Sequence, residues 1–353
     1  MIGIRIDDKK INEIKQLWSS WFFRQDRIKE LMDILEDDIV FRQMIFTSNK
    51  EFSEWKSEYH TNLSAIKNNI WRDKIIKYIF DDLSDEAYVI SKYKKKVLKN
   101  TEYFLLKNYE SYRKSMKLVK IVQIMGVEVC PYCNRNFVEN YVTRKENGQR
   151  KAYFKGDLDH YYSKEEIPAL ALSFFNLVPS CKVCNHEKSD STKRTFYPFY
   201  DNENDEYHFS IEVYDSNDTR DIVYEEPIED IEEKRFDSTV WQGISDNFKI
   251  KLHSNGEKKL SERMKNSKET FHLEKKYNHS KEYVKEMIRK RYIYSETHKD
   301  ILLKNFAGIF VNEKQIVETL YSYSDNEEYM HNRPLSKLTK DILIQIGVEI
   351  ESL

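Results

Sequence analysis

Two short cysteine pairs constrain the fold of this chain more than any other feature of its sequence. They have the same spacing, Cys130-Pro131-Tyr132-Cys133 and Cys181-Lys182-Val183-Cys184, and they contain all four cysteines of the 353 residues. A Cys-x2-Cys pair does not easily close a disulfide within itself, whereas two such pairs supply the four ligands of a tetrahedral structural zinc. The alternatives are buried thiols or a thiol redox centre, and the sequence around the pairs lacks the βαβ pattern of redox proteins. We therefore predict one structural zinc bound by Cys130, Cys133, Cys181 and Cys184.

A second group of polar residues lies between and just after these pairs. They are Asp157-Leu158-Asp159-His160, then Asn176, then Asn185 and Lys188. If the first group forms a strand, its two aspartates share one face, and Leu158 and His160 share the other. Each of these residues alone would carry little meaning, so the argument depends on their order and on their place beside the cysteine pairs.

This order resembles the HNH nuclease motif, here as an H-N-N variant formed by His160, Asn176 and Asn185. The step from Asn176 to Asn185 and the following Lys188 are similar to the HNH domain of RNA-guided CRISPR nucleases. Two sequence segments are similar to the HNH component of Septu-type bacterial defence systems. One runs from Pro168-Ala169-Leu170 through Asn176–Cys181, and the other is Phe271–Asn278. The resemblance implies a β-hairpin followed by a helix, with a divalent metal held between them.

The chemistry of phosphodiester hydrolysis suggests a role for each residue. A neutral imidazole accepts a proton near pH 7, so His160 is the expected general base. Asp159 and Asn185 offer hard oxygen ligands for a catalytic Mg2+ or Mn2+. Lys188 is expected to pair with a phosphate, and Asn176 is expected to fix the loop that carries His160.

Two neighbouring residues leave alternatives open at this stage. His186 would replace Asn185 as the metal ligand if the register were one residue later, although the spacing to Lys188 favours Asn185. Asp157 is either a second carboxylate for the metal or a solvent-facing residue at the edge of a strand.

Composition and charge place these motifs in a water-soluble, mostly helical protein. Charged residues make up 33% of the chain, Gly and Pro are few, and the net charge is −2, so the chain as a whole is not basic. The charge is segregated, because residues 91–120 carry ten bases against two acids and residues 201–240 carry 15 acids against three bases. The bases form either a solvated helix face or a track for phosphates. We expect a cytoplasmic location, since four metal-spaced cysteines suit a reducing compartment and neither a signal peptide nor a membrane span is evident.

Hydrophobic periodicity predicts a mainly α fold with an embedded ββα-metal module and a small accessory antiparallel sheet. Residues 1–122 are expected to form a helical domain that begins with a short strand over Ile2–Ile6. The tryptophans of this domain are expected in its core. Residues 123–200 form the nuclease module, with a hairpin over Phe137–Lys155 that turns near Gly148. Residues 201–353 are expected to be α+β, with strands near 207–213 and 248–252 joined by an acidic loop, and helices after 260.

These observations predict a metal-dependent HNH endonuclease that acts on DNA. The Septu resemblance alone implies a role in anti-phage defence and an ATPase partner. The sequence contains no Gly-x4-Gly-Lys-Ser/Thr phosphate-binding loop, so we do not expect the chain itself to be a P-loop sensor of nucleotide. The rival hypothesis is a non-catalytic zinc-knuckle module that binds nucleic acid or a partner protein. A pure binding module would have no reason to keep Asp159, His160 and Asn185 in this order.

Overall fold

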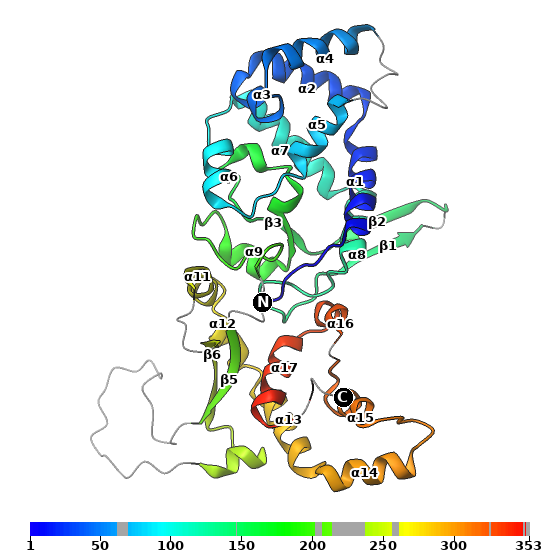
Figure 1. The fold of residues 1–353 in the computed structure, drawn as a ribbon, viewed down its shortest axis with the longest axis vertical. Coiled ribbons are helices and arrows are strands. Elements are labelled where there is room, and N and C mark those ends of the chain that lie inside the picture. Colours follow the sequence, from blue (N-terminus) through cyan, green and yellow to red (C-terminus); the bar gives the residue numbers. More distant parts are fainter. Residues whose placement is uncertain are drawn as a thin grey trace, which may run out of the picture. The chain divides into compact units, whose positions relative to one another are not determined.

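The computed structural model describes residues 1–61, 70–145, 147–201, 207–213, 237–255, 261–324, 326–348 and 350. The chain groups into two compact units (Figure 1). Unit 1 comprises Met1–Ile2, Cys133–Arg135 and Asn202–Leu353, and unit 2 comprises Gly3–Tyr132 and Asn136–Asp201. Within the described ranges the secondary structure is mainly helical with three two-stranded antiparallel sheets, so the mainly α class with small sheets is confirmed. No helix of those ranges is long and apolar enough to cross a membrane. The division into regions 1–122, 123–200 and 201–353 stays a prediction.

Unit 2 begins with helices and ends with two β-hairpins and a short helix. Its helices are α1 (Asp8–Phe22), α2 (Gln25–Asp37), α3 (Ile39–Ile45), α4 (Asn49–Thr61), α5 (Ile70–Ile79), α6 (Glu86–Tyr93), α7 (Lys99–Arg113), α8 (Met116–Met125) and α9 (Lys182–Lys188). Its strands are β1 (Asn140–Arg144), β2 (Arg150–Phe154), β3 (Asp157–His160) and β4 (Leu177–Ser180), and two 3-10 turns, η2 (Pro168–Leu170) and η3 (Phe174–Asn176), lie between β3 and β4.

The helical part of unit 2 is built around aromatic side chains, as the sequence predicts. Trp18 on α1 stacks on Phe22 with ring centroids 4.7 Å apart, and Trp21 lies 4.9 Å from Tyr112 on α7. Both tryptophans are buried, which confirms their place in the core. The contact of Trp21 with Tyr112 joins α1 to α7, and packing of apolar helix faces of this kind is the main source of helix stability in proteins.

The second hairpin of unit 2 carries the residues of the nuclease-like motif. Strands β3 and β4 pair antiparallel in a register that sets Asp157 opposite Ser180 and His160 opposite Leu177. Helix α9 follows β4 directly and packs on β3. The chain thus forms two strands and a helix in the order β3–β4–α9.

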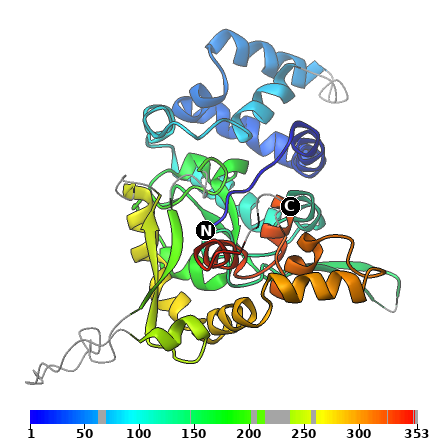
Figure 2. The same ribbon diagram turned by 60° about the horizontal axis from the view of Figure 1, so that its bottom comes forward.

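Unit 1 contains the accessory sheet and the C-terminal helices. Strands β5 (Tyr207–Val213) and β6 (Phe248–Ser254) pair along their whole length, which confirms the two predicted strands, and α17 (Ser336–Gln345) packs on β5 (Figure 2). The other elements of unit 1 are η4 (Ser238–Gln242), α11 (Glu262–Thr270), α12 (Leu273–Asn278), α13 (Lys281–Ile293), α14 (Glu296–Asn305), α15 (Glu313–Tyr321) and α16 (Glu327–Asn332). Most of the acidic loop expected between β5 and β6 lies outside the described residues, as does Glu146 in the turn of the first hairpin.

The tripeptide Cys133–Arg135 is held by hydrogen bonds inside unit 1. Tyr277 donates its hydroxyl to the Cys133 carbonyl at 2.7 Å. Asn134 is left-handed at φ 46°, and its side-chain oxygen accepts from the Lys337 backbone N–H at 3.0 Å and from the Ser336 hydroxyl at 3.1 Å. An asparagine suits this position, because it tolerates the left-handed region and offers a side-chain acceptor.

One local prediction from hydrophobic alternation is wrong. Residues Ile2–Ile6 do not form a strand, although Ile2 and Ile4 are buried. The Ile4 N–H donates to the Pro198 carbonyl at 2.5 Å, and none of the strands that the structure describes continues this pairing into a ladder. Alternation records burial on one face, but a strand also requires a partner strand.

Candidate active site and metal centre

The four cysteines lie together as a cluster suited to a metal ion. Their sulfur atoms are all within 4.8 Å of one another, and all four side chains are buried. The structure describes all four and joins none of them in a disulfide. Zinc–sulfur bonds of about 2.3 Å in a tetrahedron place the sulfurs about 3.8 Å apart, so only a small contraction would be needed. The cluster could therefore hold a metal ion such as zinc.

Hydrogen bonds around Cys181 also suit a bound metal. The Asn136 side-chain amide donates to the Cys181 sulfur at 3.4 Å, and the Cys184 backbone N–H donates to the same sulfur at 3.5 Å. Cys181 is the N-cap residue of α9, so its sulfur lies at the positive end of the helix. N–H donors and a helix N-terminus both favour the thiolate form that binds zinc.

Asp159 and Lys188 form a buried ion pair between β3 and α9. The Lys188 ammonium donates to Oδ1 of Asp159 at 3.1 Å and to the His160 carbonyl at 2.6 Å. Tyr132 donates to the other carboxylate oxygen of Asp159 at 2.6 Å. Asp159 is 2% exposed and Lys188 is 1% exposed. A buried ammonium with these partners cannot also meet a phosphate in solvent, so the geometry favours a positioning role for Lys188 over the predicted phosphate contact.

Asn185 lies one turn before Lys188 on the same face of α9. It is beside Asp157 of β3. Its side-chain amide donates to Oδ2 of Asp157 at 3.2 Å, and Arg113 on α7 donates to Oδ1 at 3.0 Å. Among the described residues Asn185 makes no hydrogen bond to Asp159. Asp157 is thus a partner of Asn185 and Arg113, not a residue that faces solvent alone. The two aspartates of β3 both face α9, as strand alternation predicts.

His160 ends β3 with its ring fixed in one orientation. Its Nε2 lies 3.1 Å from the Ala171 carbonyl, and its ring lies 4.5 Å from the ring of Tyr109 on α7. A carbonyl oxygen only accepts, so Nε2 must carry the proton, and in the neutral ring Nδ1 keeps its lone pair. Protein atoms surround the ring although part of its surface reaches solvent, and this desolvation lowers the pKa of His160 from 6.5 to about 4. The imidazole is therefore neutral at pH 7.

Asn176 fixes the chain that leaves His160. Its side-chain oxygen accepts from the Tyr162 N–H at 2.7 Å, and its amide donates to the carbonyls of Tyr162 and Leu170, both at 3.1 Å. The residue is fully buried. These bonds join the loop after β3 to the turn η2, which precedes the carbonyl of Ala171 that orients the imidazole.

The structure therefore divides the predicted residues into two pairs and a separate histidine. Asp159 lies with Lys188, Asp157 lies with Asn185, and His160 is oriented by Ala171. In the described part of the chain, the four cysteines are the one group of three or more Cys, His, Asp or Glu side chains close enough to share a metal. Local spacing missed Tyr109, Arg113, Tyr132 and Ala171, because these contacts join elements that are remote in sequence or outside the motif. Of these four residues, only two lie in features that the sequence analysis singled out. Arg113 belongs to the basic run, and Tyr132 lies inside the first cysteine pair.

Part of the basic run is paired with acids. Lys92 pairs with Asp81 at 2.9 Å, Lys94 with Glu166 at 3.1 Å, and Lys107 with Glu30 at 3.0 Å. Other exposed bases, Lys95, Lys96, Lys99, Lys114 and Lys120, form no ion pair with the described residues. A phosphate track along this run stays a prediction.

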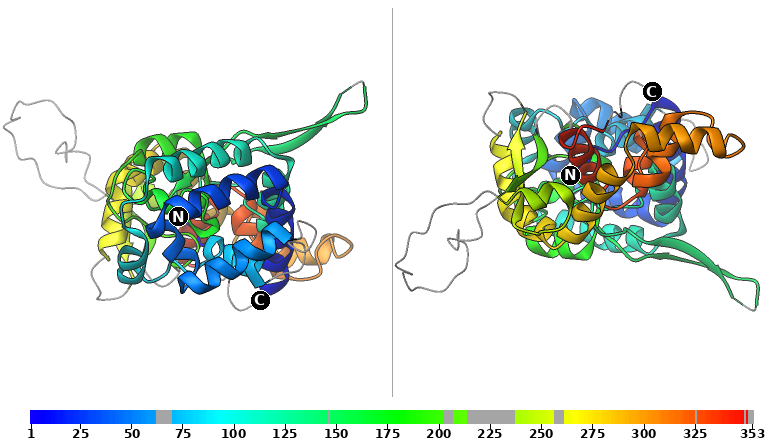
Figure 3. Two further views of the ribbon diagram at one scale, coloured as in Figure 1. Left: turned by 90° about the horizontal axis from the view of Figure 1, so that it is seen from above. Right: turned by 90° about the horizontal axis from the view of Figure 1, so that it is seen from below.

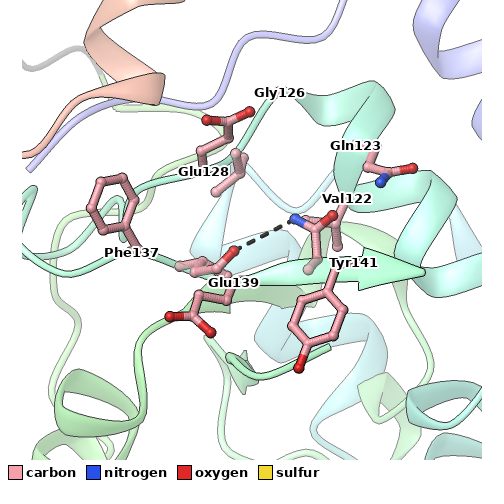
Figure 4. Close-up of a pocket in the computed structure, with 10 residues that line it drawn as sticks. Val122, Gln123, Gly126, Glu128, Phe137, Glu139 and Tyr141 are labelled. Carbon is pink, nitrogen blue, oxygen red and sulfur yellow. Dashed lines mark hydrogen bonds between the residues drawn. The ribbon is translucent and has the colours of Figure 1, made fainter. Parts of the chain in front are cut away.

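A surface hollow of about 400 Å3 lies over α8 and β1, apart from these residues (Figure 4). Its lining includes Glu128, Glu139, Phe137 and Tyr141. Two carboxylates at its rim do not suit an anionic substrate, and none of the motif residues lines it. We assign the candidate site to β3, β4 and α9, not to this hollow.

No family model, curated protein or solved structure matches this chain.

Proposed function

We propose that this chain is an HNH-type endonuclease that hydrolyses phosphodiester bonds in DNA with the help of a divalent metal, and that the four-cysteine cluster holds a structural zinc. The observation that carries the proposal is the state of His160. The ring is neutral, its orientation is fixed through Nε2, and Nδ1 is left as an acceptor at the end of the strand. A general base that activates water at neutral pH needs these properties.

Oxygen ligands for a catalytic metal ion lie where β3 packs against α9. Both oxygens of each aspartate accept hydrogen bonds, but the Asp157 side chain is 20% exposed and the Asp159 side chain only 2%. Asp157 and the side-chain oxygen of Asn185 therefore fit such an ion better than Asp159, which is buried against the Lys188 ammonium. A bound Mg2+ or Mn2+ would supply Lewis-acid stabilisation of the phosphate and leaving oxygen. Asp159 then supports the site through the Lys188 ammonium, which holds the His160 carbonyl.

A plasmid-nicking assay on the full chain tests the proposal. Supercoiled plasmid is incubated with Mg2+, with Mn2+ or without added divalent metal, using wild type and His160→Ala. Replacing a general base lowers the rate by roughly two to four powers of ten, so His160→Ala should be nearly inactive. His279→Ala removes an exposed histidine of unit 1 and should cut like wild type. Equal cutting by wild type and His160→Ala would refute the proposal.

The choice of metal ligands has its own test in the same assay. Asp157→Asn and Asn185→Ala should raise the Mg2+ concentration needed for half-maximal rate. A loss with His186→Ala and none with Asn185→Ala would indicate the register shifted by one residue. If Asp159→Asn raises the metal requirement at unchanged stability and Asp157→Asn does not, Asp159 is the ligand.

We further propose that the nuclease acts in anti-phage defence with an ATPase partner, on the strength of the Septu resemblance. Unit 1 offers a surface for such a partner, because α14 has no buried residue and a group of apolar side chains in and around it is exposed. The group consists of Tyr292, Ile293, Ile301, Phe306, Ile309 and Val311. Co-purification of an ATPase with wild type, and its loss with Ile309→Asp/Val311→Asp, would support this partner. Retention with that variant would place the partner elsewhere.

One observation favours the rival hypothesis of a non-catalytic binding module. Asp159 and Lys188 neutralise each other inside the protein, which is an ordinary structural arrangement. A chain that binds DNA and contains zinc but does not cut any DNA with either metal would be such a module.

A further inference from the structure

The first hairpin of unit 2 combines a largely exposed strand with a concentration of positive charge. Strands β1 and β2 project from the rest of unit 2 as a two-stranded ribbon (Figures 1 and 3). All of β1 beyond Asn140 is exposed, including Tyr141 and Val142 at 40% each. The end of the hairpin nearest α8 packs on that helix, and Ala152, Tyr153 and Phe154 of β2 are half-buried. A two-stranded hairpin that is exposed along much of its length is marginally stable in water. We refer to residues 140–155 as the β1–β2 ribbon.

The charge of the ribbon is mostly positive. Its sequence has a single acid, Glu146, and its five bases are Arg144, Lys145, Arg150, Lys151 and Lys155. None of the five forms an ion pair with any residue that the structure describes. Arg144 and Arg150 lie directly opposite each other in the register, so their side chains share a face. Like charges placed opposite each other destabilise a hairpin, and an anionic partner would remove that penalty.

The second face of the ribbon combines aromatic rings with a base. Tyr141 and Tyr153 stack across the strands with centroids 5.2 Å apart, and the Lys151 ammonium lies 4.9 Å from the Tyr153 ring. The dimensions also suit a duplex, because the major groove of DNA admits a two-stranded ribbon and five residues per strand span roughly 17 Å.

The ribbon is joined by a short, closely packed connection to the strand that carries His160. Only Lys155 and Gly156 separate β2 from β3. At Gly156 a Cβ atom would lie 2.6 Å from a Val138 methyl carbon and 2.8 Å from the Ser180 carbonyl oxygen, so the joint is closely packed. DNA bound along the ribbon is therefore held by an element continuous with the candidate active site.

We infer that the β1–β2 ribbon binds duplex DNA along a groove, with Arg144 and Arg150, which share a face, on phosphates. The inference rests on the proposed function for its choice of DNA as the polyanion. Contacts of this kind position the duplex without reading its sequence, so binding should be strongly salt-dependent.

Fluorescence anisotropy with a labelled duplex of about 20 base pairs tests the inference. The full chain carries His160→Ala so that the duplex is not consumed. Adding Arg144→Ala/Arg150→Ala should weaken binding roughly tenfold at about 100 mM KCl and reduce the slope of log K against log[KCl] by about two. The control Lys29→Ala/Lys50→Ala removes two exposed bases elsewhere on unit 2 and should leave both quantities unchanged. Arg144→Lys/Arg150→Lys keeps the charge and should keep the slope.

The outcomes separate this inference from the proposed nuclease activity. If the alanine pair binds DNA as tightly as its parent, or if the parent does not bind duplex DNA, the ribbon is not a DNA-binding element, whether or not wild type cuts plasmid. If binding depends on the ribbon and wild type cuts no plasmid, the inference stands and the nuclease proposal fails. Tighter, ribbon-dependent binding of single-stranded RNA would overturn duplex DNA as the partner.

Discussion

Replacing Lys188 by methionine should destabilise unit 2 far more than removal of an exposed lysine. The change keeps the length of the side chain but leaves the Asp159 carboxylate, 2% exposed, without its cation. At the observed separation of 3.1 Å and an effective dielectric constant of about 20, the lost attraction is about 5 kcal/mol. Breaking a buried pair by removing one partner costs about 3–5 kcal/mol in measured cases, and we expect Lys188→Met to fall in that range.

A double-mutant cycle distinguishes a buried charge from lost packing. Asp159→Asn alone leaves the ammonium unpaired and should cost a similar amount, whereas Asp159→Asn/Lys188→Met leaves no uncompensated charge. The double variant should therefore be more stable than the sum of the two changes predicts, by about 2 kcal/mol or more.

Urea unfolding followed by tryptophan fluorescence suits this measurement. Four of the five tryptophans, Trp18, Trp21, Trp55 and Trp71, lie in unit 2, so the signal reports mainly on that unit. Lys50→Met is the matched control, because Lys50 pairs with Glu54 at 3.9 Å in solvent and should contribute little. Additive costs in the cycle, or equal effects of Lys188→Met and Lys50→Met, would refute the reasoning.

Three further predictions follow from the same geometry. Because the pKa of His160 is lowered to about 4, the imidazole stays neutral well below pH 6.5. The value of kcat/KM for plasmid cutting should therefore be constant down to about pH 6 and fall only as the pH approaches 4. A midpoint of the pH profile near 6.5 would contradict this. Gly156→Ala should destabilise unit 2 by about 1–3 kcal/mol in the same urea assay, because its Cβ would overpack against Val138 and Ser180, and an unchanged free energy of unfolding would contradict this. Cys181→Ser should lower the zinc content below one ion per chain by elemental analysis and lower the melting temperature of the protein; wild type that lacks metal, or a variant with an unchanged melting curve, would argue against a structural zinc.

The sequence alone determined features that depend on local spacing or on chemistry with few solutions. Two Cys-x2-Cys pairs with no other cysteine predicted the cluster, because four thiols at that spacing have one common use. Alternation of Asp157 to His160 predicted that the two aspartates share a face, since a strand has a period of two whatever it packs against. The buried tryptophans and the pairing of β5 with β6 followed from hydrophobic periodicity for the same reason.

Only the tertiary structure decided which side chains meet. The sequence grouped Asp159 with Asn185 and left Lys188 for a phosphate, whereas the packing of α9 on β3 pairs Lys188 with Asp159 and Asn185 with Asp157. Tyr109 and Arg113 reach β3 from α7, and the Ala171 carbonyl reaches His160 from a later turn, through contacts that no local pattern records. The pKa of His160 depends on this surrounding protein, because desolvation is set by everything packed around the ring. Spacing specifies what a residue can do, and packing determines which partner it has and how much water it retains.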